Sequence, residues 1–258
     1  MVDPITHETP GLVYELIPGD SGTLQIASGR VSYPDGKGCA DALVTIEQHG
    51  IPRNGRSIVR WLHTTTNDNG TYGVFSDVTS KTLIAWAAHP DGYLGLAYVD
   101  RGVADIQFEP GSTSVYVRDE NCQPVSEADV IVHECGIEDL THRVPPNIQK
   151  LLTRRTDRDG IAKFRGISTT GGLGDQAFEV RHNGMAYVRD TYSGSSGQRL
   201  FVLTDAYDSS VDKRCANSIL GADGWHGFHG RLASIAPLAR QGAKRANSSK
   251  KQRSSPLD

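Results

Sequence analysis

The chain is poor in the residues and spacings that mark catalytic or metal sites. Its 258 residues include only four cysteines and two methionines. The cysteines are scattered, and no Cys-x-x-Cys pair occurs, so they predict neither a zinc site nor a disulfide scaffold. We expect free or structural thiols at Cys39, Cys122, Cys135 and Cys215. No Gly-x-Ser-x-Gly elbow and no His-x-x-Glu segment occurs, so we expect no catalytic residues, metal or cofactor.

Long apolar runs and a strong net charge are also missing. No apolar run approaches the ~20 residues of a membrane-spanning helix. The first ten residues lack the basic start and apolar core of a signal peptide. The net charge of −3 predicts no polyanionic partner for the body of the protein. We therefore expect no membrane span and no export signal, while the compartment stays open.

What the sequence does contain is an internal repeat. Val117 lies 86 residues after Val31, and the segments 31–46 and 117–132 match at that constant offset. Further on, Gly160 lies 90 residues after Gly70, so the second copy has the longer excursion before this glycine. Both copies end on Ala-Tyr-Val. Self-similarity over this length predicts two copies of one fold.

Each copy carries a strong turn signal. Asn69-Gly70 stands between Thr64–Thr66 and the alternating strand of Tyr72 and Val74, and Asp159-Gly160 holds the same place in the second copy. Such pairs are typical of type I′ hairpins, which need positive φ. We predict equivalent hairpins with left-handed glycines at both places.

Alternating apolar residues predict strands with one buried face. Val44, Ile46, Tyr72 and Val74 are expected in the first core, and Ala128, Val130, Val132 and Phe164 in the second. Residues 82–88 are apolar on both faces, which indicates a strand covered on both sides or one near a domain junction. The fold class is therefore all-β, with two tandem sandwiches.

These motifs resemble the carboxypeptidase regulatory-like domains, which have a transthyretin-like (prealbumin-like) β-sandwich. The first copy carries the resemblance in Gly29 to Val31, Ala42 to Ile46, Asn69 to Tyr72 and Gly92-Tyr93, and the second in Val117, Ala128 to Val130, Asp159-Gly160, Phe164 and Gly184-Met185. The B-type repeats of collagen-binding adhesins look similar. The resemblance implies an accessory module that supports an enzyme, spaces surface modules or binds a partner, in the cell envelope or outside the cell.

The expected organisation has four parts: a leader at 1–22, sandwiches at 23–110 and 111–204, and a basic tail at 205–258. The leader contains an extended apolar piece, Leu12 to Tyr14, which pairs at a sheet edge or belongs to a mobile arm. We expect the tail to be disordered. A contact with nucleic acid or another anionic surface is its alternative role, and His226 and His229 without a third ligand predict no metal site.

The best candidate for a binding surface is the excursion from Gln48 to Trp61. An aromatic ring among cationic side chains suits a sugar, a peptide or a protein partner. The candidate residues are His49, Arg53, Arg56, Arg60 and Trp61. In the alternative interpretation Trp61 fills the sandwich and the arginines face solvent.

We expect a non-catalytic accessory module with a binding or structural role. The alternative is a small hydrolase similar to the transthyretin-like hydroxyisourate hydrolases, because Tyr192 to Ser195 resembles part of their C-terminal motif. His89 and His182 are expected at equivalent strand ends. Asp68, Asp157 and Asp159 fit turn chemistry, with a weak cation site as the alternative.

Overall fold

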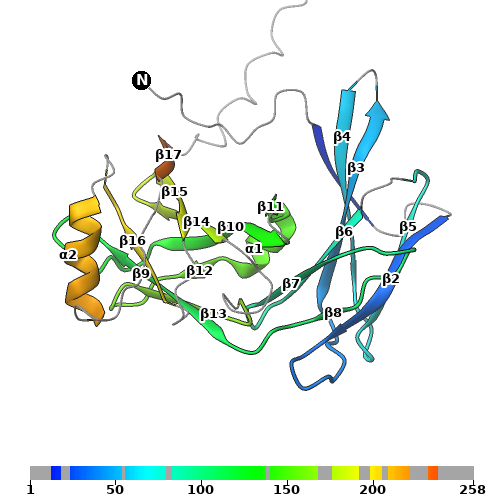
Figure 1. Cartoon of the computed structure of the whole chain (residues 1–258), viewed down its shortest axis with the longest axis horizontal. Helices are drawn as coiled ribbons and strands as arrows, with labels where there is room; N and C mark the ends of the chain where they lie inside the picture. The colour runs from blue at the N-terminus through cyan, green and yellow to red at the C-terminus, as the bar shows by residue number, and fades with distance from the viewer. Residues whose placement is uncertain are drawn as a thin grey trace, which may run out of the picture.

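A computed structural model describes residues 13–18, 24–53, 56–79, 83–137, 140–167, 176–191, 198–204, 209–220 and 232–237. Strands dominate these residues, and they form two neighbouring β-sandwiches (Figure 1). The all-β prediction is thereby confirmed. Within these ranges, no helix has the length and apolar character needed to cross a membrane.

The first sandwich consists of two facing sheets. One has the order β1 (Val13–Pro18), β4 (Arg56–Thr65), β3 (Leu43–Arg53), β6 (Leu83–His89) and β7 (Tyr93–Tyr98). The other has the order β5 (Thr71–Ser76), β2 (Leu24–Ser32) and β8 (Ile106–Gln107). The expected residues Val44, Ile46, Tyr72 and Val74 are all buried in the core between these sheets, which confirms the predicted strand register.

The second sandwich is built in the same way. One sheet has the order β11 (Leu140–Arg143), β10 (Asp129–Ile137), β14 (Gln176–His182), β15 (Met185–Thr191) and β17 (Leu232–Pro237), and β12 (Arg154–Arg155) also pairs with β10. The other has the order β13 (Ile161–Arg165), β9 (Ser112–Arg118) and β16 (Gln198–Val202). Helices α1 (Pro146–Leu152) and α2 (Ser209–Leu220) complete it. Ala128, Val130, Val132 and Phe164 are buried in its core, as expected.

The Asn69-Gly70 and Asp159-Gly160 segments are corners between sheets, so the hairpin prediction is wrong. β4 belongs to one sheet and β5 to the other, and β12 and β13 are divided in the same way. In the first corner the Gly70 amide donates to the Asn67 carbonyl at 2.8 Å. Only the glycines, with φ of 78° at Gly70 and 66° at Gly160, have the predicted left-handed backbone, because Asn69 and Asp159 do not have positive φ.

A side chain at the start of each corner explains why it turns without a hairpin. The Asn67 Oδ1 accepts hydrogen bonds from the amides of Asn69 and Thr71, both at 3.0 Å. The Asp157 Oδ1 accepts two in the same way, from Asp159 at 3.0 Å and Ile161 at 2.9 Å. Such Asx turns hold the backbone locally.

A buried threonine precedes each corner and makes the same hydrogen bonds in both sandwiches. The Thr66 hydroxyl donates to the Cys39 carbonyl at 2.6 Å and accepts from the Ala42 amide at 2.9 Å. The Thr156 hydroxyl donates to the Val125 carbonyl at 2.8 Å and accepts from the Ala128 amide at 2.9 Å. Each threonine therefore ties its corner to the other connection between the two sheets, the segment just before β3 or β10.

The outer face of β6 and β7 is part of the second core. Ile84, Trp86, Ala88 and Leu94 are fully or almost fully buried in one cluster with residues of β9, β10 and β14. Ile148 and Leu152 of α1 belong to the same cluster, between β10 and β6. The strand that is apolar on both faces thus lies between the two buried cores and is covered on both sides.

Segments near both ends of the chain cover sheet edges. β1 pairs with β4 in parallel. Of the two alternatives predicted for the apolar piece of the leader, pairing at a sheet edge is therefore the correct one. β17 pairs with β15, and α2 packs on β16. The expectation of a disordered tail from residue 205 onward is therefore wrong for α2 and β17. The rest of that tail, with His226 and His229, lies outside the described residues.

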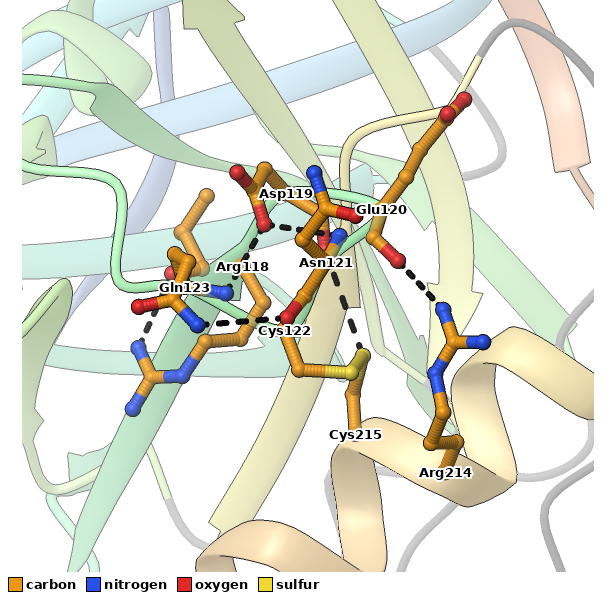
Figure 2. Close-up of a disulfide and its surroundings, with 9 residues drawn as sticks. Arg118, Asp119, Glu120, Asn121, Cys122, Gln123, Arg214 and Cys215 are labelled. Carbon is orange, nitrogen blue, oxygen red and sulfur yellow. Dashed lines mark hydrogen bonds between the residues drawn. A yellow bond between two sulfur atoms is a disulfide. The ribbon is translucent and has the colours of Figure 1, made fainter.

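The expectation of free or structural thiols is wrong for two of the four cysteines. Cys122 and Cys215 form a disulfide across a sequence separation of 93 residues (Figure 2), whereas Cys39 and Cys135 are buried free thiols. The sequence did not reveal this pair because the two residues meet only once α2 packs against the second sandwich.

Candidate functional site

The predicted binding excursion, Gln48 to Trp61, belongs to a long β-hairpin. β3 and β4 remain paired out to Arg53 and Arg56, with one irregularity between Gln48 and Ile51 (Figure 1). Only Asn54 and Gly55 separate the paired ends. Asn-Gly is the strongest short hairpin signal, so the sequence did contain the information needed to find this arm.

The structure does not gather the five candidate residues on one face. Trp61 is only 4% exposed, so it offers no exposed platform for a sugar or peptide. Its neighbour Arg60 points to the opposite face of the strand, where its Nη1 lies 3.2 Å from Asp77 Oδ1. The side chains of Arg53 and Arg56, at the end of the arm, lie outside the described residues.

His49 belongs instead to a polar cluster between the sandwiches. Its Nε2 lies 2.8 Å from Glu47 Oε1. The other carboxylate oxygen, Oε2, accepts a hydrogen bond from Trp86 Nε1 at 3.0 Å. Glu47 is 6% exposed and Trp86 is fully buried. The Glu47 carboxylate therefore lies in the largely apolar face between the sandwiches, where two side chains bind it, as a buried charge requires.

The second sandwich contributes to this cluster through β11 and α1. Asn147 Nδ2 donates to Thr45 Oγ1 at 2.9 Å. The ring of His142 stands edge-on to Tyr98, with centroids 6.2 Å apart. We call these residues the junction cluster: Thr45, Glu47, His49, Trp86, Tyr98, His142 and Asn147.

The two histidines of the junction cluster have opposite pKa shifts. The hydrogen bond to Glu47 raises the pKa of His49. Burial lowers the pKa of His142, although Glu47 acts in the opposite direction. The His49 imidazole beside Glu47 thus favours its charged form, and the His142 imidazole favours its neutral form.

A second set of polar contacts lies where the turn between β6 and β7 meets the second sandwich. Arg154 donates from Nη2 to the Pro90 carbonyl at 2.7 Å, and from Nη1 to the Thr153 carbonyl at 3.1 Å. A Cβ on Gly166 would lie 2.2 Å from the Tyr93 ring. This close approach requires glycine and fixes the turn against β13.

Neither free thiol of the described ranges is activated as a nucleophile. Burial raises the pKa of the Cys39 thiol and of the Cys135 thiol, so neither is an activated thiolate. His89, at the end of β6 as expected, lies 3.5 Å from Asp91 and 3.5 Å from the Tyr33 hydroxyl. Among the described ranges no group of three or more histidine, cysteine or acidic side chains is arranged to hold a metal ion.

The remaining candidates are turn or strand-end residues. His182 ends β14, at the position equivalent to His89. Asp157 uses its carboxylate for the corner before Gly160, and Asp68 and Asp159 are exposed. Tyr192 to Ser195, the segment that resembles a hydrolase motif, lies outside the described residues.

Sequence reasoning missed most of the junction cluster. Glu47, Trp86, His142 and Asn147 come from four elements of two sandwiches, and no local spacing links them. The available signal was the strand 82–88, which is apolar on both faces and contains Trp86.

Comparisons with known proteins give no close relative. No protein-family model matches, and no curated protein matches. Among solved structures, the chain is similar to the Bacillus anthracis TIE protein, with 13% identity, a TM-score of 0.25, and 70% of this chain and 34% of that one covered. A streptococcal ancillary pilin shows 11% identity and a TM-score of 0.24, with 72% of this chain and 64% of that one covered.

A third structure, the Corynebacterium diphtheriae major pilin SpaA, shows 8% identity and a TM-score of 0.23, with 72% of this chain and 60% of that one covered. The chain therefore spans less than two thirds of the length of each of these proteins. Likenesses at this level do not transfer a function to this chain.

Proposed function

We propose that the chain is a non-catalytic structural module in which the two sandwiches form one rigid unit. The observation that carries this proposal is the shared core. Trp86 and Leu94 of the first sandwich lie in the same buried cluster as Val130 and Phe178 of the second. An interface that is large and hydrophobic opposes the relative motion that is the default for neighbouring domains.

Polar contacts fix the orientation that the shared core permits. Asn147 bonds to Thr45, and Arg154 bonds to the Pro90 carbonyl. The bond from Asn147 is part-buried, so breaking it leaves a partly desolvated group without its partner, whereas the bond from Arg154 is exposed and adds mainly direction. A rigid pair of sandwiches suits a role in spacing or presenting neighbouring parts of an assembly to a protein partner.

We also propose that the two sandwiches are tandem copies of one transthyretin-like domain, of the carboxypeptidase regulatory-like kind, with boundaries at about residues 23–110 and 111–204. The matching hydrogen bonds of Thr66 and Thr156 support this proposal. The matching left-handed residues Asp41 and Glu127, with φ of 55° and 60°, support it independently, because non-glycine residues seldom adopt this conformation.

A structural role accounts for the side chains better than hydrolysis does. Hydrolysis needs an activated nucleophile or water and a base within reach. Here the thiols of Cys39 and Cys135 have raised pKa values, and the Glu47 carboxylate is engaged by His49 and Trp86.

Rigidity is tested by a distance measurement on the full chain. Nitroxide labels on Asp68→Cys and Arg158→Cys, two exposed corner residues, report one distance between the sandwiches. We expect a single narrow distribution, as narrow as that of a control pair within the first sandwich, Asp68→Cys and Lys37→Cys. A broad or bimodal distribution for the first pair alone would contradict the rigid unit.

The partner is tested separately with peptide, glycan and 5-hydroxyisourate screens. The probes are the intact chain and the variant Arg53→Ala/Arg56→Ala, with Arg155→Ala as an exposed arginine control. We expect no turnover, and any peptide or glycan binding at the β3–β4 arm to be lost only in the first variant. Robust hydrolysis would overturn the non-catalytic proposal.

A further inference from the structure

The disulfide joins the only long helix of the described ranges to the second sandwich. Cys122 lies in the turn after β9, and Cys215 lies in α2 (Figure 2). The two Cα atoms are 4.9 Å apart, within the usual range for a disulfide. Arg214, beside Cys215 in α2, donates a hydrogen bond to the Glu120 carbonyl of the same turn.

Cys122 occupies a backbone position that favours glycine. Its φ is 63°, and Gly36, which lies 86 residues earlier in the matching turn, has φ of 81°. The turns share their hydrogen bonds: the Gly36 amide donates to the Tyr33 carbonyl and the Cys122 amide to the Asp119 carbonyl, both at 2.9 Å. A side chain at such a position has a conformational cost, which the bond to Cys215 offsets.

The surface beneath α2 is apolar only in the sandwich that has the helix. Leu200 and Val202 of β16 are buried with Cys215 and Ala216, and Tyr116 packs against them. The matching positions of the first sandwich are Arg30, Asp105 and Gln107, and all three are exposed. An apolar sheet face of this kind needs a cover, and α2 is that cover.

We propose that α2 is a disulfide-held cover and that the chain folds and works in an oxidising compartment. α2 packs on its own small cluster, separate from the main core, so the covalent bond supplies much of what holds it. Disulfides form and persist outside the reducing cytosol. Reduction would release α2 and expose the apolar face of β16, while the main core of the sandwich remains. This inference goes beyond the proposed structural role and does not rest on it.

The first test counts thiols in the full chain produced under oxidising conditions. In denaturant without reductant, alkylation is expected to modify two cysteines, Cys39 and Cys135, and a peptide that links Cys122 to Cys215 is expected by mass spectrometry. After reduction all four cysteines are expected to react. Four reactive thiols before reduction, or a pairing that involves Cys39 or Cys135, would overturn the proposal.

The second test measures tryptic cleavage of the native chain. In Cys122→Ser/Cys215→Ser, cleavage after the exposed Arg214 of α2 is expected to rise about tenfold or more, because proteolysis follows the population of the opened state. Cleavage after the exposed Lys163 on β13 reports opening of the sandwich itself and is expected to stay unchanged. The parent chain treated with reductant provides the matched measurement and is expected to show the same change.

Equal cleavage after Arg214 in the parent and in the double variant would show that the disulfide does not hold the helix. A parallel rise after Arg214 and Lys163 would show that the disulfide holds the whole sandwich. Either result would contradict a separate cover.

Discussion

The carboxylate of Glu47 accepts a hydrogen bond from the indole nitrogen of Trp86 at 3.0 Å, in the wall between the two sandwiches. Glu47 comes from β3 and Trp86 from the neighbouring β6, in the sheet whose outer face is part of the second core. The bond lets an acidic side chain stay buried where the rest of the wall is apolar. It thus places a polar, directional contact at the junction of the two sandwiches.

Removal of either partner of this bond is expected to destabilise the whole chain. Glu47→Ala leaves the Trp86 Nε1–H buried without its acceptor, at a cost of about 1–3 kcal/mol. Trp86→Ala opens a cavity in the shared core and is expected to cost roughly 3–5 kcal/mol. Urea unfolding measures both values.

A double-mutant cycle of Trp86→Phe, Glu47→Ala and the double variant isolates the hydrogen bond, because phenylalanine keeps most of the volume of Trp86 and has no donor. The double variant is expected to lose less stability than the sum of these two single variants, since residues in contact couple. Strict additivity would mean that the hydrogen bond contributes nothing to stability.

The two buried threonines are expected to contribute equally. Thr66→Val and Thr156→Val each remove a hydroxyl that donates to one backbone carbonyl and accepts from one backbone amide. Each is expected to cost about 1–3 kcal/mol, because a buried backbone group loses its partner. Thr65→Val, at an exposed position, is the control and is expected to stay within about 0.5 kcal/mol of the parent. A large effect at only one of the two buried sites would argue against equivalent roles.

The corner glycines are expected to tolerate no side chain. A Cβ on Gly70 would lie 2.3 Å from the Val31 carbonyl oxygen, and one on Gly160 2.6 Å from that of Val117. Gly184 has the same left-handed backbone, with φ of 78°, but open space around it. Alanine at Gly70 or Gly160 should therefore cost more than alanine at Gly184, by roughly 1 kcal/mol or more. Thermal unfolding of the three variants compares them, and equal losses would refute the steric argument.

The junction histidines are expected to give opposite pH dependence. The hydrogen bond to Glu47 raises the pKa of His49, so its contribution to stability is fully present below the unfolded pKa and is lost as pH rises through the folded pKa. Burial lowers the pKa of His142, so its contribution is present above the unfolded pKa and is lost as pH falls through the folded pKa.

Urea unfolding at about pH 5 and pH 8, on either side of the usual histidine titration, separates the two. Relative to the parent, His49→Gln is expected to lose more stability at about pH 5 than at about pH 8. His142→Gln is expected to do the reverse. Shifts of the same sign in both variants would contradict the assigned pKa directions.

The cores and corner glycines could be predicted because their signals are local. Alternation placed Val44 and Ile46 in the first core and Val130 and Val132 in the second. The Asn-Gly rule failed at Gly70 because the side chain of Asn67 forms the turn between two sheets. The same rule would have found the arm whose strands pair at Arg53 and Arg56.

The junction and the disulfide could not be predicted because they depend on packing between distant segments. His142 lies near Glu47 only because α1 and β11 dock on the outer face of the first sandwich. Cys122 lies beside Cys215 only because α2 packs on the apolar face of β16. The burial of Trp61 has a similar cause, since β4 carries it on the same face of the sheet as Glu47.

Calorimetry of the intact chain tests the rigid unit most directly. If the outer face of β6 and β7 is part of the second core, neither sandwich unfolds without exposing Trp86 and Leu94. The chain should then show a single transition whose calorimetric and van't Hoff enthalpies agree, the signature of two-state unfolding. Two resolved transitions, each with the enthalpy of one sandwich, would contradict the shared core as the basis of the structure.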